Sequence, residues 1–172
     1  MEFAEVIGGR ESVRSYDPAR PVPPEVLARV LEAGRIAPSA ANRQPWKLVL
    51  VSSPEGLERL RGCYGQPWFR DAPHVLAVKG SRAQAWKRQR DGWVSLETDL
   101  AIAMDHMILA AENEGLATCW ISAFDPQALR RALALADDEE VFAITPICYP
   151  RPGFAKRAAR TRKPFDEVVE LR

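Results

Sequence analysis

Residues 38–46 read Pro-Ser-Ala-Ala-Asn-Arg-Gln-Pro-Trp, a stretch too polar and too rich in proline to belong to a hydrophobic core. It joins an amphipathic segment at 24–37 to an apolar, strand-like run at 46–51. The side chains that both donate and accept hydrogen bonds are Ser39, Asn42 and Gln44. Two prolines stiffen the backbone around them. We therefore predict a loop between a helix and a strand that presents polar groups to a planar, polar ligand.

Helices and strands alternate on both sides of this loop. Helical spacing and capping residues predict helices at 2–8, 24–37 and 95–114, and shorter helices that begin at Ser53 and Asp125. Apolar runs predict strands at 46–51, 74–78, 118–121 and 140–149, and a last strand at 167–171. Residues 83–92 are polar and basic, and we expect a surface helix or a lid segment there. No repeat or linker divides the sequence, so we expect one α+β or α/β three-layer domain over residues 1–172.

The predicted helix at 95–114 is apolar on nearly every side. Between Leu100 and Ala111 only Asp105 and His106 are polar. Such a helix is buried either inside a core or in a subunit interface. In a domain of 172 residues we favour the interface as the cover for its second face, and this favours a homodimer.

The charges are balanced overall but unevenly placed. The 24 basic and 23 acidic residues leave a formal charge of +1, so no overall field points to nucleic acid or to a membrane surface. Residues 151–163 nevertheless carry six basic side chains and no acidic one. Taken alone, such a run indicates a solvated surface or a tail that attracts RNA.

Cysteine usage and the N-terminus indicate the compartment. The three cysteines are odd in number and lack metal-type spacing, which argues against a disulfide framework and against a zinc site. The first residues, 1–9, do not resemble a signal peptide, and no apolar run approaches the ~20 residues that span a bilayer. We expect a cytoplasmic protein without membrane or nucleic-acid partners.

Four separated segments resemble the sequence pattern of the nitroreductase family of flavin mononucleotide (FMN) enzymes. Residues 38–46 resemble its Pro-Ser-x-x-Asn-x-Gln-Pro-Trp signature. Residues 10–14, Arg-Glu-Ser-Val-Arg, are similar to its Arg-Arg-Ser-x-Arg turn, with Glu11 in place of a frequent basic residue. Residues 115–124, Gly-Leu-Ala-Thr-Cys-Trp-Ile-Ser-Ala-Phe, are similar to its Gly-Leu-Gly-Thr-Cys-Trp-Ile-x-Ala-Phe strand. Residues 160–169, Arg-Thr-Arg-Lys-Pro-Phe-Asp-Glu-Val-Val, resemble its terminal Arg-Lys-Pro-x-x-Glu-Val-Val.

This resemblance implies that the chain binds FMN. The residues at the matching cofactor-binding positions are Arg10, Ser12, Arg14, Pro38, Ser39, Ala40, Asn42, Gln44, Trp120, Ile121, Ser122, Ala123, Arg160 and Arg162. The arginines and Ser12 would meet the phosphate or the polar edge of the flavin, because guanidinium groups and hydroxyls suit both. Arg160 and Arg162 alternate, so an extended backbone directs both to one side, which favours them over Lys163 as the phosphate pair.

The resemblance also implies how the remaining segments are arranged. The strand at 115–124 lies along the flavin ring in the family, where Trp120 and Ile121 would form an apolar face and the backbones of Ser122 and Ala123 would make polar contacts near atom N5. The loop at 38–46 reaches across a dimer interface toward a flavin bound mainly by the partner. The implied fold is α+β, with three layers (α-β-α), a mostly antiparallel central sheet and a C-terminal strand exchanged between the subunits of a homodimer.

The residues reveal no acid–base pair, activated nucleophile or metal cluster, so we predict neither a catalytic side chain nor a metal site. This pattern fits flavin chemistry, in which the protein orients the cofactor and tunes its electronics. The resemblance implies hydride transfer from NADH or NADPH through flavin N5 to a nitroaromatic, quinone or similar small electron-poor acceptor. Two alternatives stay open: a non-catalytic protein that stores or senses FMN, and a dehalogenating or flavin-cleaving relative of the same fold.

Overall fold

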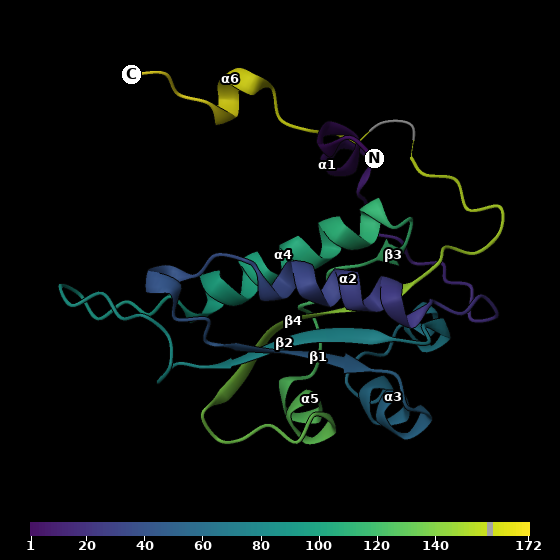
Figure 1. Cartoon of the computed structure of the whole chain (residues 1–172), viewed down its shortest axis with the longest axis horizontal. Coiled ribbons are helices and arrows are strands. Elements are labelled where there is room, and N and C mark those ends of the chain that lie inside the picture. Colours follow the sequence, from purple (N-terminus) through teal and green to yellow (C-terminus); the bar gives the residue numbers. More distant parts are fainter. Residues whose placement is uncertain (158–159) are drawn as a thin grey trace.

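The computed structural model describes residues 1–157 and 160–172. Its centre is a four-stranded sheet in the order β1-β2-β4-β3, in which every neighbouring pair is antiparallel (Figure 1). The strands are β1 (Trp46–Val51), β2 (Val75–Ser81), β3 (Ala117–Thr118) and β4 (Glu139–Cys148). Strand β2 lies between β1 and β4, and nearly all of its side chains are buried. This explains why β2 is a continuous apolar run rather than an alternating one.

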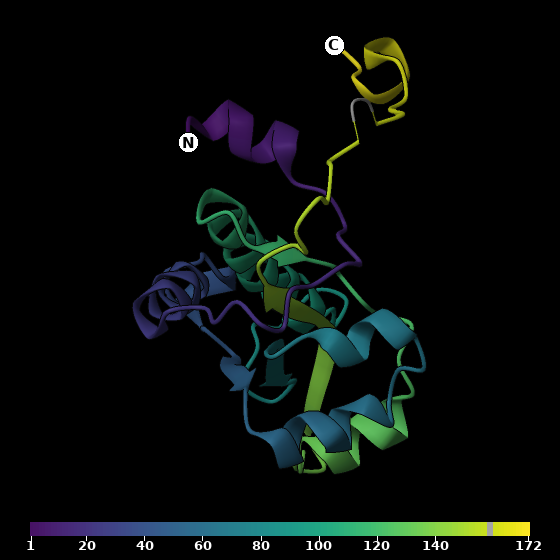
Figure 2. The same cartoon turned by 90° about the vertical axis from the view of Figure 1, so that its right-hand side faces the viewer.

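Helices cover both faces of the sheet (Figures 1 and 2). Helices α2 (Pro24–Arg35) and α4 (Leu96–Asn113) lie on one face, and α3 (Pro54–Arg61) and α5 (Pro126–Ala132) lie on the other. Helices α1 (Phe3–Gly9) and α6 (Phe165–Val168) belong to terminal segments that extend away from the sheet. Two short 3-10 helices, η1 (Ala40–Asn42) and η2 (Pro67–Asp71), lie in loops. The predicted α+β fold with three layers is confirmed.

Helix α4 carries much of the core. Its side chains that are at most 2% exposed and belong to the main core cluster include Leu100, Met104, Met107 and Ile108. They pack against α2 and against strands β2 and β4. On another side of the helix, Ile102 and Leu109 are only partly buried. The helix is thus apolar on nearly every side, as predicted, and one apolar stripe stays partly exposed.

The segment at 83–92 is a hairpin, so the prediction of a helix there is wrong. Lys87 pairs with Val94, and the amide of Arg88 donates to the carbonyl of Trp93 at 2.8 Å. The turn contains Asp91 and Gly92, and Gly92 has φ 76°. An Asp-Gly pair favours a tight hairpin turn because glycine adopts positive φ without strain.

The prediction of a strand at 167–171 is also wrong. Residues 165–168 form the short helix α6, and the residues after it are extended and exposed. Pro164 precedes the helix and Asp166 and Glu167 lie in its first turn, which is a favourable helix start.

The other helices lie within two residues of their expected bounds at 2–8, 24–37 and 95–114. In the described part of the chain, no helix is both long and apolar enough to cross a bilayer.

Candidate cofactor site

The segment at 10–14 is fixed to strand β3. Ser12 forms a parallel bridge with Thr118, and the amide of Val13 donates to the carbonyl of Thr118 at 2.9 Å. The hydroxyl of Tyr16 donates to the carbonyl of Val13 at 2.6 Å from a fully buried position. Burial raises the pKa of Tyr16 far above its ordinary value, so the hydroxyl remains a donor. Two of the segments identified in the sequence therefore lie side by side.

Two buried carboxyl groups hold the C-terminal residues 156–157 and 160–162, here called the tail, against residues 10–14. Glu112, which is 5% exposed, pairs with Lys156, and Lys156 also donates to the carbonyl of Gly9 at 3.2 Å. Glu11 is 8% exposed and accepts the amide of Arg157 at 3.2 Å. Glu11 thus has a structural partner in the tail, which explains how an acidic residue is accommodated where the family pattern has a basic one.

A pocket of about 420 Å³ lies where the tail meets residues 10–14. It is lined by Arg10, Glu11, Ser12, Arg14, Arg157, Arg160, Thr161 and Arg162. Five of the sequence-predicted site residues are brought together here. The lining contains five guanidinium groups and a single carboxyl group, that of Glu11. Arg157 and Thr161 were missed by the sequence analysis, although Arg157 belongs to the same basic run. This concentration of guanidinium groups suits a phosphate monoester.

The arginines in this pocket differ in how they are held. Arg160 donates to the carbonyls of Gly8 and Arg10, at the end of α1. Arg162 is exposed and donates to the carbonyl of Thr161 at 2.8 Å. Arg160 therefore fixes the pocket wall, while Arg162 lies at its open side.

The strand-like segment after β3 is shorter in regular pairing than predicted. Regular pairing covers residues 117–118, and a single further pair joins Ile121 to Ile144. Ile121 is 3% exposed and packs in the core on the α3 and α5 side. Trp120 packs against the core on the α2 and α4 side and contacts Phe142 edge-to-face at 5.9 Å. Neighbouring side chains of an extended segment point to opposite faces, so the expected single apolar surface of Trp120 and Ile121 does not form.

The next two residues lie at the surface. Ser122 and Ala123 are exposed, and the hydroxyl of Ser122 accepts the indole N–H of Trp120 at 3.2 Å. Cys119 is buried, and burial raises the pKa of its thiol, with nearby Arg14 acting in the opposite direction. A buried thiol that stays protonated is a poor nucleophile, so Cys119 has a structural role.

The loop at 38–46 is fixed at the other end of α4. The amide of Ala40 donates to Asp99 Oδ1 at 2.9 Å, and the hydroxyl of Ser95 donates to Asp99 Oδ2 at 2.7 Å. Asp99 is 1% exposed. Within the loop, the amide of Gln44 donates to Ser39 Oγ at 2.9 Å. One buried carboxyl group thus sets the position of the start of the loop.

The backbone of this loop is strained. Ala41, Asn42 and Gln44 have φ values of 51°, 53° and 48°, in the left-handed region that residues other than glycine rarely adopt. The carbonyl of Pro45 also lies against Gly80, where an added Cβ would stand only 2.1 Å from that oxygen. Such conformations persist where the surrounding contacts impose them, and they are concentrated at functional sites.

Within one chain, the loop at 38–46 and the segment at 10–14, which lines the arginine pocket, lie toward opposite ends of α4 (Figure 1). Asp99 contacts the loop and Glu112 contacts the tail. These two residues are 13 positions apart on the helix, which corresponds to about 20 Å at 1.5 Å per residue. The structure therefore brings Arg10, Ser12, Arg14, Arg160 and Arg162 together but keeps the loop residues away from them.

We expect the substitution Asp99→Ala to destabilise both the loop and the fold. It leaves the amide of Ala40 and the hydroxyl of Ser95 without their acceptor, and unpaired buried groups cost roughly 1–3 kcal/mol each. The expected loss in the free energy of unfolding is about 2–4 kcal/mol, measured by urea denaturation. Asp105→Ala, at an exposed position of the same helix, is the matched control. Equal stability of the two variants would contradict this role for Asp99.

Comparison with known proteins places this arrangement in a family. The sequence model of the Nitroreductase family matches residues 7–63 and 61–149. The NADH dehydrogenase of Thermus thermophilus is 30% identical over 93% of this chain and 91% of that protein. A crystal structure of a nitroreductase family protein from Clostridium difficile 630 superposes with a TM-score of 0.89 at 35% identity, covering 99% of this chain and 98% of that one. An FMN-dependent nitroreductase from Clostridium difficile R20291 shares the fold, with a TM-score of 0.80, 23% identity and 96% of each chain covered.

These matches show that the chain has the α+β fold of a class of oxidoreductases. The chain belongs to the nitroreductase family. The sequence-based prediction of a nitroreductase-like oxidoreductase is confirmed at this level.

Proposed function

We propose that the protein binds FMN without a covalent bond and transfers two electrons from NADH or NADPH to an electron-poor acceptor such as a nitroaromatic compound or a quinone. The observation that carries this proposal is the pocket between residues 10–14 and the tail residues Arg157 and 160–162, where five guanidinium groups lie together beside β3. Guanidinium groups form paired, charge-assisted hydrogen bonds to phosphate oxygens. Membership of the family and the name of the FMN-dependent nitroreductase with the same fold support FMN as the ligand.

FMN supplies the redox chemistry when it is bound, because its ring can accept a hydride and pass it on. The tasks of the chain itself are binding and orientation. Arg14, Arg160 and Arg162 would hold the phosphate, and Arg160 would also keep the pocket wall in place through its two backbone contacts. The exposed residues Ser122 and Ala123 would meet the flavin ring through their backbone groups. No side chain is needed as a general acid or base in this scheme.

We further propose that the site is completed by a second copy of the chain. The loop at 38–46 lies about 20 Å along α4 from the tail contact in its own chain, so it can serve a partner's flavin more readily than its own. Large apolar side chains at both ends of the chain support an interface: Phe3, Phe165 and Leu171 are 70%, 73% and 89% exposed. Burying these side chains against a second copy would remove their apolar surface from water. Exchange of the C-terminal segment between subunits would cover them, although this segment is α6 followed by extended chain rather than a strand.

The proposal is tested by the visible spectrum and by turnover. We expect purified protein, saturated with FMN, to show flavin absorption bands and to release free FMN on heating or acidification. It should also oxidise NADH or NADPH steadily once a quinone or nitroaromatic acceptor is added. Protein that neither contains nor takes up FMN would contradict the proposal. Stable FMN binding without steady oxidation of either nucleotide would favour the alternative of a storage or sensor protein.

A further inference from the structure

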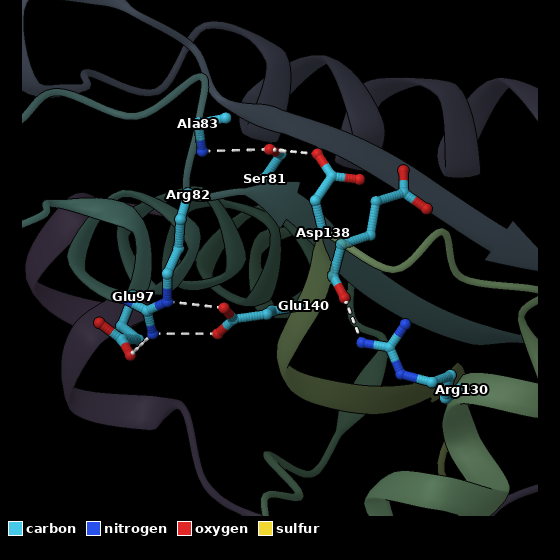
Figure 3. Close-up of polar contacts among 8 residues, drawn as sticks. Ser81, Arg82, Ala83, Glu97, Arg130, Asp138 and Glu140 are labelled. Atoms are coloured by element: carbon cyan, nitrogen blue, oxygen red, sulfur yellow. Dashed lines mark hydrogen bonds and ion pairs between the residues drawn. The ribbon is translucent and has the colours of Figure 1, made fainter.

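The hairpin formed by residues 82–95, here called the basic hairpin, is anchored to the body of the protein at its stem. Arg82 contacts Glu97 of α4, and its Nε donates to Glu140 of β4 at 2.6 Å (Figure 3). Neighbouring contacts in the same view join Ser81 to Asp138 at 2.7 Å. The stem is therefore tied to both α4 and the sheet, while the tip projects from the body (Figure 1).

The basic hairpin and the loop at 38–46 are fixed to the same carboxyl group. The amide of Ser95 donates to the carbonyl of Trp86 at 3.0 Å, which closes the stem. The hydroxyl of Ser95 then donates to Asp99, and the other oxygen of Asp99 accepts the amide of Ala40. The loop at 38–46 and the stem of the basic hairpin are therefore neighbours. A flavin contacted by this loop would have the basic hairpin beside it.

The basic hairpin combines aromatic and cationic side chains. Trp86 and Trp93 pack edge-to-face at 6.4 Å, and Trp93 is 42% exposed. Arg88 lies over the ring of Trp93 and forms a two-point ion pair with Asp91, at 2.6 and 2.8 Å. This pair offsets the charge of Arg88. Two exposed cations near the tip, Lys87 and Arg90, are therefore left to set the sign of the local field.

We propose that the basic hairpin borders the acceptor side of the partner's flavin site and favours aromatic acceptors that carry a carboxylate. This inference rests on the proposed function, because it requires the loop at 38–46 to lie at a flavin. The exposed ring of Trp93 offers a surface for a planar acceptor, and Lys87 and Arg90 attract an anionic substituent on it. The selectivity is electrostatic, so it weakens as ionic strength rises.

The test compares 4-nitrobenzoate with its neutral analogue 4-nitrobenzamide as acceptors for the FMN-loaded protein. We expect the wild type to prefer the benzoate in kcat/KM. The double substitution Lys87→Gln/Arg90→Gln should lower kcat/KM for the benzoate by about tenfold at low salt, from two exposed charge contacts, and leave the benzamide nearly unchanged. The dissociation constant of 4-nitrobenzoate, measured by calorimetry on the oxidised holoprotein, should rise by a similar factor.

The matched control is Arg59→Gln/Arg131→Gln, which removes two exposed charges from α3 and α5 on the opposite face of the sheet. This control should keep the preference for the benzoate. An unchanged ratio of the two acceptors in the hairpin variant would overturn the inference while leaving the proposed function intact. A rise in KM for NADPH alone would also overturn it, because the cations would then serve the donor. Protein that binds no FMN would contradict the proposed function and the inference together.

Discussion

Mixing an Asn42→Ala protomer with an Arg162→Ala protomer should produce heterodimers in which half of the flavin sites bind FMN with wild-type affinity. In a shared site, the arginine pocket of one chain is completed by the loop of the other. One of the two sites in the heterodimer then carries both substitutions, and the other carries neither. The physical basis is the separation of about 20 Å along α4 between the contacts of the loop and of the tail within one chain.

This result can be read from a titration with FMN that resolves two classes of site. Heterodimers are isolated with two different affinity tags, and each homodimeric variant is measured alongside them. If the loop served its own chain, every heterodimer site would carry one substitution and none would recover full affinity. A folded monomer that binds FMN as tightly as the wild type would contradict both the dimer and the shared site. Because Asn42 has φ 53°, Asn42→Gly is a useful second variant that removes the side chain without backbone strain.

The double substitution Arg160→Ala/Arg162→Ala should weaken FMN binding by about 10²- to 10⁴-fold. Hydrogen bonds between charged groups contribute roughly 1.5–3 kcal/mol each, and each factor of ten corresponds to about 1.4 kcal/mol. Riboflavin has the same ring as FMN but lacks the phosphate. The double variant should therefore bind riboflavin with nearly the affinity of the wild type. Quenching of flavin fluorescence can measure the dissociation constants of both FMN and riboflavin.

The two arginines are separated by single substitutions. Arg162→Ala tests phosphate binding with little disturbance, since the one hydrogen bond of its side chain within the described residues is to the neighbouring carbonyl of Thr161. Arg160→Ala also releases the carbonyls of Gly8 and Arg10, so it should weaken riboflavin slightly as well. Lys163→Ala is the control. Lys163 directly follows Arg162, so in an extended segment its side chain points to the other side, and it is not among the residues that line the pocket. Unchanged FMN affinity in the double variant would mean that the basic tail is only a solvated surface.

Much of the fold could be predicted because its signals are local. The bounds of β2 and α4 follow from apolar runs and capping residues, and both were expected within a few residues. Two errors came from local signals that were given too little weight. Asp91-Gly92 is a hairpin turn, and the sequence from Pro164 to Glu167 is a helix start.

The arrangement of the site depended on contacts between residues far apart in the chain. No periodicity predicts that Glu11 accepts the amide of Arg157, or that Asp99 holds Ala40. Arg160 and Arg162 both line one pocket, but Thr161 between them lines it too, so the alternation of side chains along an extended segment does not by itself explain their placement. The same rule, applied to Trp120 and Ile121, shows why these neighbours could not share one surface.

The spacing of Asp99 and Glu112 on α4 restricts where insertions and deletions can be tolerated in the sequence. A residue inserted between Asp99 and Glu112 would turn the rest of the helix by about 100° and advance it by 1.5 Å. One of the two anchoring carboxyl groups would then point away from its partner. Insertions and deletions should therefore be rejected within this helix and accepted at the hairpin tip around residues 88–92, where the backbone already turns in solvent. Changes in length at that tip would preserve the spacing between the loop and the pocket.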